Sequence, residues 1–88
     1  MNLNNFEDYV SETILERGSE YYHDLAVADL QGLEKGQWFA IVEGTKEYQV
    51  DVRLDETDEI LEYRCTCPYE GEICKHVVAV LYEILEVS

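Results

Sequence analysis

The sequence CTCPYEGEICKH, residues 65–76, holds all three cysteines of this 88-residue chain and one of its two histidines. These four side chains follow the spacing C-x-C-x6-C-x-H and are Cys65, Cys67, Cys74 and His76. Residues two apart on an extended strand point the same way, and Pro68 and Gly71 between the two pairs favour a reversal of the chain. Three thiolates and one imidazole complete the tetrahedral coordination of Zn²⁺. The stretch therefore predicts one structural zinc ion per chain.

Three other interpretations of these residues remain open but are weaker. A disulfide between Cys65 and Cys67 would close a very tight ring, and any single disulfide leaves the third cysteine unpaired. Cys74 and His76 could form a nucleophile–base pair, but the other two cysteines would then have no role and no third group is evident. The last alternative is that the four donors lie together by chance.

Other polar and aromatic residues are expected to have ordinary roles. Glu70 and Glu72 lie between the two donor pairs, and we expect solvated carboxylates there because cysteine and histidine are better zinc donors. We expect His23 to pack or to lie at the surface, and Trp38 to pack in the core. Lys75, between two donors, could interact with a thiolate sulfur.

The composition indicates a small, strongly acidic folded protein. There are 20 acidic and 6 basic residues, which give a net charge of −14, and this charge disfavours binding to nucleic acid. Hydrophobic residues make up 47% of the chain, which is enough for a thin core that a metal can reinforce. The chain has no apolar run of ~18 residues and no secretory leader, so we expect a cytoplasmic protein with reduced thiols and no membrane segment.

Working outward from the cysteines, the hydrophobic pattern predicts an α+β fold. After them, apolar residues at helical spacing predict a helix over 75–85, although three valines leave a strand open by pattern alone. Before them, alternation predicts an antiparallel meander of about four strands. These strands are expected at residues 25–33, 37–44, 46–55 and 59–67. On the last one, Leu61, Tyr63, Cys65 and Cys67 are expected to share a face.

The N-terminal part predicts helix. Apolar residues at helical spacing indicate a helix over 4–17, with Asn4 or Asn5 as its cap and Gly18 as its stop. Residues 19–24 could add a further turn that is capped by Ser19. We therefore expect a single zinc-binding domain over residues 1–88. It divides into a helical segment (1–24), an antiparallel sheet (25–64) and a zinc-binding end with a helix (65–88).

The donor spacing resembles that of the SWIM zinc finger, whose ligands follow C-x-C-x(n)-C-x-H. The flanking sequences CTCPY and CKHVVAVLY are similar to bacterial members, and weaker similarity extends upstream through RGSEYYHD, GQWFAIVEG and EYQVDV. The resemblance implies a ββα-like finger in which the second donor pair leads into a helix. It also implies a module that binds DNA or protein, sometimes beside a helicase-like ATPase. The chain itself has no phosphate-binding G-x-x-x-x-G-K-[ST] sequence.

Charge and motif together predict a non-catalytic, zinc-stabilised interaction module. A protein partner is favoured because the net charge of −14 opposes contact with nucleic acid. The alternative, which the resemblance implies, is a nucleic-acid-binding module of a larger helicase-associated or other DNA-processing protein. An enzyme would need an open metal position or an activated nucleophile, and the sequence shows neither.

Overall fold

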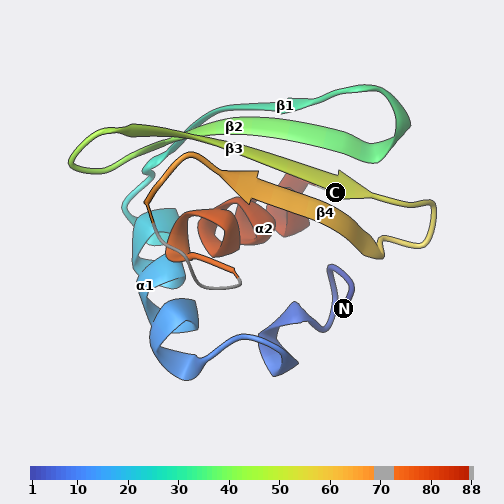
Figure 1. Cartoon of the computed structure of the whole chain (residues 1–88), viewed down its shortest axis with the longest axis horizontal. Coiled ribbons are helices and arrows are strands. Elements are labelled where there is room, and N and C mark those ends of the chain that lie inside the picture. The colour runs from blue at the N-terminus through green and yellow to red at the C-terminus, as the bar shows by residue number, and fades with distance from the viewer. Residues whose placement is uncertain (69–72, 88) are drawn as a thin grey trace.

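A computed structural model describes residues 1–68 and 73–87 and shows a four-stranded antiparallel sheet with helices on one of its faces (Figure 1). The strands follow chain order across the sheet: β1 (Val27–Gly32), β2 (Gln37–Glu43), β3 (Glu47–Leu54) and β4 (Ile60–Cys65). The helices are α1 (Glu12–His23) and α2 (Lys75–Val87), and two short 3₁₀ turns are η1 (Phe6–Asp8) and η2 (Glu34–Gly36). The expected α+β meander with a C-terminal helix is confirmed.

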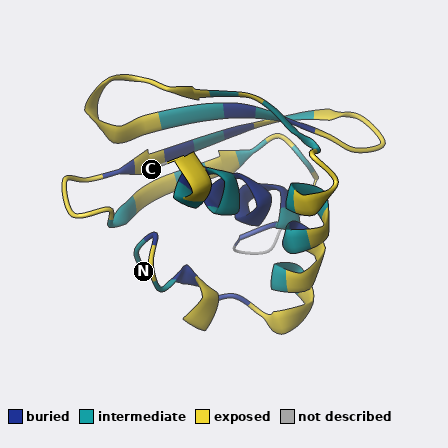
Figure 2. Cartoon of the chain, turned by 180° about the vertical axis from the view of Figure 1, so that it is seen from behind, coloured by how far each residue is buried: buried dark blue, intermediate teal, exposed yellow. Residues whose placement is uncertain are grey.

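The alternation along the strands decides which face of the sheet is buried. On β2 and β3 every second side chain is buried, and these residues include Ala40, Val42, Val50 and Val52. They pack against α2, whose residues from His76 to Leu81 are all buried. Figure 2 shows this helix as the dark centre of the molecule, between the sheet and α1. The C-terminal helix is therefore the core element of the fold.

A bulge in β4 changes the face that was expected for its first residues. Val52 pairs with Tyr63, but Leu54 pairs with Ile60, so β4 carries one extra residue there. The prediction that Leu61 shares a face with Tyr63 is wrong, because the bulge brings Ile60 inward and leaves Leu61 48% exposed. Beyond the bulge the register holds, and Tyr63 and Cys65 both pack against the core.

The predicted bounds of the N-terminal helix are also wrong. Helix α1 begins after Ser11, whose Oγ accepts a hydrogen bond from the backbone N–H of Ile14 at 3.3 Å. It then runs through Gly18 and Ser19 to His23. Gly18 therefore does not stop the helix. It lies inside α1, and because it has no side chain, α1 can pack directly against Val78 of α2. Ser19 likewise lies inside the helix and caps nothing.

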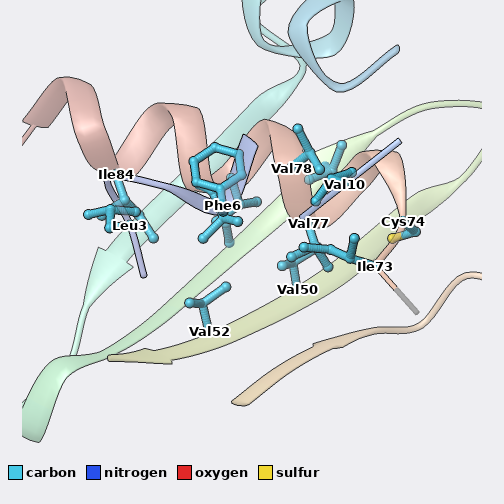
Figure 3. Packing of buried hydrophobic residues seen from close by; sticks show 14 of the residues in the cluster. Leu3, Phe6, Val10, Val50, Val52, Ile73, Cys74, Val77, Val78 and Ile84 are labelled. Carbon is cyan, nitrogen blue, oxygen red and sulfur yellow. The ribbon is translucent and has the colours of Figure 1, made fainter. Parts of the chain in front are cut away.

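The chain before α1 closes the far end of the core. Leu3, Phe6 and Val10 are buried, and Figure 3 shows Leu3 and Phe6 beside Ile84 of α2. The ring of Phe6 meets the ring of Tyr82 edge to face, with 5.3 Å between the centroids. Within the described part of the chain, no helix has the length and apolar character that crossing a membrane requires.

Candidate metal centre

The four donors lie where β4 ends and α2 begins. Cys65 is the last residue of β4, and His76 lies in the first turn of α2. Beyond β4, Thr66 stays bound to Gln49 of β3, because its N–H donates to the Gln49 carbonyl at 3.1 Å and its Oγ1 accepts from the Gln49 N–H at 3.0 Å. This pairing holds the chain against the sheet between Cys65 and Cys67. The two donor pairs therefore come from elements that the core already fixes side by side.

The distances within the cluster fit a tetrahedral metal. The ligand atoms of Cys65, Cys67, Cys74 and His76 all lie within 4.8 Å of one another. The Nδ1 atom of His76 is 3.6 Å from the sulfur of Cys65 and 3.8 Å from that of Cys74. Zinc bonds of ~2.3 Å to sulfur and ~2.0 Å to nitrogen place these atoms roughly 3.5 Å apart at the tetrahedral angle. This Cys₃His site can bind one zinc ion.

Cys65 and Cys74 share a hydrogen bond, and this bond shifts the pKa values of the two thiols in opposite directions. Hydrogen bonds with Cys65, the largest cause, and with His76 together lower the pKa of Cys74 to about 4, against the opposing effect of burial. The hydrogen bond with Cys74 raises the pKa of Cys65, and burial adds to that rise. When zinc binds, the ligand cysteines must be thiolates, so any remaining thiol protons leave as the metal is bound.

Aromatic rings surround His76 and fix its orientation. The Tyr48 ring of β3 stacks on the imidazole at 4.2 Å between centroids and 24° between planes. The Tyr21 ring of α1 meets it edge to face at 5.2 Å. The imidazole is 4% exposed, and its Nε2 has no hydrogen-bond partner among the described residues. With Nδ1 directed at the thiols, Nε2 is the nitrogen that keeps the proton in a metal-binding neutral ring.

These two tyrosines were not predicted as parts of the site. The alternation along β3 puts Tyr48 on the face of Val50, but it does not show that His76 would lie against this face. Tyr21 comes from a helix whose bounds were predicted incorrectly. The interaction of Lys75 with a thiolate was considered through either its backbone or its ammonium group, and the Nζ atom of that group lies over the Tyr21 ring, 5.5 Å from the centroid.

A cleft opens beside the cluster. Its volume is about 390 Å³, and three of the four donors lie on its wall. The described residues that line it are Thr13, Ile14, Arg17, Tyr48, Cys67, Pro68, Cys74, Lys75 and His76. The metal centre is therefore bordered by a concave surface formed by α1, the beginning of β3 and the start of α2.

The remaining candidate residues lie apart from this centre. His23 is exposed at the end of α1, with its ring 5.1 Å from that of Tyr22. Trp38 packs against the core, as expected. Glu70 and Glu72 lie outside the described residues.

Comparison with known proteins finds a family model that matches part of the chain. Residues 48–85 match the family model of the SWIM zinc finger. The matched segment spans β3, β4, the four donors and most of α2. No curated protein and no solved structure matches the chain.

Proposed function

We propose that Cys65, Cys67, Cys74 and His76 are the zinc ligands of a non-catalytic module that binds another protein, because residues 48–85 match the SWIM zinc finger model and contain this Cys₃His cluster. The observation that supports this most strongly is the convergence of the four ligand atoms within 4.8 Å, from the end of a strand and the start of a helix. Four protein donors complete a structural zinc site and leave no position for a substrate.

In this proposal the role of zinc is to stabilise the folded structure. The ion would join the end of β4 to the start of α2, the most buried element of the molecule. Structural zinc in finger peptides contributes ~10–16 kcal/mol of apparent binding free energy, whereas a whole domain is stable by only ~5–15 kcal/mol. The metal would therefore hold the core helix in place, and contact with a partner would be left to the protein surface.

Charge favours protein over nucleic acid as the partner. Nucleic-acid binding draws on clustered Lys and Arg side chains, and this chain has 6 basic residues against 20 acidic ones. The nucleic-acid alternative has one observation in its favour, which is that Arg17 and Lys75 line the same cleft. A module of a larger DNA-processing protein would need this pair to outweigh the surrounding carboxylates.

Two measurements on the purified full chain test the proposal. Native mass spectrometry is expected to show one zinc ion per folded chain, and Cys67→Ser and His76→Ala are each expected to abolish that mass. A folded chain without zinc would contradict the assignment of the ligands. Titration with DNA and RNA oligonucleotides at low salt is expected to show no binding at micromolar protein. Salt-sensitive binding there would favour the nucleic-acid alternative instead.

A further inference from the structure

We propose that the cleft beside the metal centre binds one acidic side chain of a protein partner, flanked by apolar residues of the same partner segment. This inference rests on the proposed function and names the chemistry of the partner. The cleft volume of about 390 Å³ lies within the range of small-ligand sites, so it can hold a few side chains but not a folded surface.

The lining of the cleft is unusual for this chain. Twenty of the 88 residues are acidic and six are basic, yet the described lining contains two basic residues and no acidic one. Arg17 and Lys75 supply the positive charge, and Ile14, Tyr48 and Pro68 supply apolar walls. A carboxylate between apolar neighbours is the group that matches such walls, because the charges pair while the flanking side chains are buried.

The packing of the helices brings the two cations together. A Cβ atom built on Gly18 would lie 3.1 Å from the backbone oxygen of Lys75, so α1 passes directly beside the start of α2 at this point. Arg17 precedes that contact, and Tyr21 lies one helical turn after Arg17 on the same side of α1. The Lys75 ammonium lies 5.5 Å from the Tyr21 ring centroid, and Lys75 lines the same cleft as Arg17.

Neither cation forms an ion pair with a carboxylate of the described residues. Within residues 1–68 and 73–87, the ion pair that forms joins the Met1 ammonium to Glu59, so no described carboxylate pairs with Arg17 or Lys75. When zinc is bound, three thiolates and Zn²⁺ leave one negative charge at the centre. Arg17 and Lys75 are the charged side chains that the described lining contributes beside that centre, and their positive charge suits an incoming carboxylate.

A single carboxylate suits the site better than a polyanion. Glu12, Glu16 and Glu20 are exposed along α1, each one residue before Thr13, Arg17 or Tyr21. An extended chain of phosphates that reached the cleft would also meet this row of carboxylates and be repelled. A short segment with one negative charge avoids most of that repulsion.

The test uses the zinc-loaded full chain and two synthetic peptides, acetyl-Leu-Glu-Leu-amide and acetyl-Leu-Gln-Leu-amide. In ¹⁵N-resolved NMR titrations, the Glu peptide is expected to shift the amide signals of Thr13, Arg17 and Lys75. Its affinity is expected to exceed that of the Gln peptide about fivefold, as for a partly exposed ion pair. Equal affinities, or shifts confined to other surfaces, would overturn the role of the cleft and leave the proposed function standing.

Matched variants test which basic side chains bind the carboxylate of the Glu peptide. Arg17→Gln is expected to remove the fivefold preference for the Glu peptide, and so is Lys75→Gln, while Lys46→Gln in the exposed β2–β3 turn leaves the preference unchanged. Native mass spectrometry must show one zinc ion in each variant, so that a lost metal is not mistaken for a lost contact. An unchanged preference in zinc-loaded Arg17→Gln overturns the proposal.

A thymidine oligonucleotide of twelve residues is the last arm of the test. It is expected to leave the signals of Arg17 and Lys75 in place at low salt. If the oligonucleotide binds there more tightly than the Glu peptide, the cleft takes phosphate, and both this inference and the choice of a protein partner fail together.

Discussion

At Gly18 two helices approach because one residue has no side chain. A Cβ atom added there would lie 2.7 Å from the Cβ of Val78, a distance shorter than Cβ atoms in real structures essentially ever show. Val78 cannot move aside easily, because it is fully buried and its branched side chain is stiff in a helix. Gly18 therefore sets the distance between α1 and α2, and with it the position of the cleft beside the metal centre.

Gly18→Ala should destabilise the protein even though alanine is the better helix former. Overpacking costs about 1–3 kcal/mol, and over most of that range the cost exceeds the helix propensity gain of about 1 kcal/mol. Denaturant unfolding of the zinc-loaded protein should show the loss. Gly32→Ala is the matched control, because its Cβ would lie 3.4 Å from the nearest atom of Trp38, and it should change stability by less than about 0.5 kcal/mol. A Gly18→Ala protein as stable as the parent would contradict the packing argument.

Tyr48 should act on the metal through His76. The stacked phenol ring, 4.2 Å from the imidazole, holds the ring with Nδ1 toward the thiols. Tyr48→Ala should therefore weaken zinc binding about tenfold, since loss of one aromatic pair together with its burial is worth about 1.4 kcal/mol. Competition with a chromophoric chelator measures the affinity. Tyr48→Phe keeps the stacking and should bind zinc like the parent, and equal weakening in both variants would assign the effect to the hydroxyl group instead.

Among the elements, the β3–β4 hairpin depends on its connecting loop. The Asp55 carboxylate accepts hydrogen bonds from the backbone N–H groups of Thr57 at 2.8 Å and Glu59 at 2.9 Å, and from the Thr57 hydroxyl at 2.8 Å. These bonds lower the pKa of Asp55, with the backbone of Glu59 as the largest cause. The loop thus fixes the start of β4, the strand that ends at Cys65.

The stability that Asp55 contributes should depend on pH. Because its pKa is lower in the folded state, the contribution is fully present above the ordinary value of 3.8 and is lost as the pH falls through the folded pKa. Asp55→Ala should lower the thermal midpoint at pH 7, and Asp55→Asn should lower it less because an amide oxygen still accepts hydrogen bonds. Because protons also displace zinc from thiolates at acid pH, melting curves are compared only over the pH range in which native mass spectrometry still shows the bound ion. The advantage of the parent over Asp55→Asn should shrink toward the acid end of that range. A constant difference across that range would show that the carboxylate charge does not matter.

For the whole molecule, the metal should decide whether the core persists. Chelation of zinc should unfold at least residues 65–85, because α2 supplies much of the buried core and both donor pairs lie at or near its start. Circular dichroism should show the loss of helix, and amide NMR signals should lose their dispersion. Zn²⁺ should restore both and Mg²⁺ should not, since magnesium prefers oxygen ligands. A chelated chain that still melts cooperatively at the parent temperature would contradict this role.

Local patterns in the sequence were sufficient for much of this architecture. The alternation of β3 predicts its buried face, and the helical spacing after His76 predicts α2, because both signals come from neighbours along the chain. The spacing of the four donors likewise predicts that they can converge, and the structure brings them together. The bulge that exposes Leu61 could not be predicted, because it arises from pairing between strands.

What only the tertiary structure decided is what surrounds the donors. Gly18 reads as a helix stop in the sequence, and only the packing of α1 on α2 shows it as a contact point. The same packing places Tyr21 against His76 and brings Arg17 and Lys75 to one cleft. These residues are far apart along the chain, so no periodic pattern connects them, and their contacts exist only after sheet and helices have closed around a common core. The sequence by itself determined which four donors could converge and the order of the elements, and the fold determined the surface beside them.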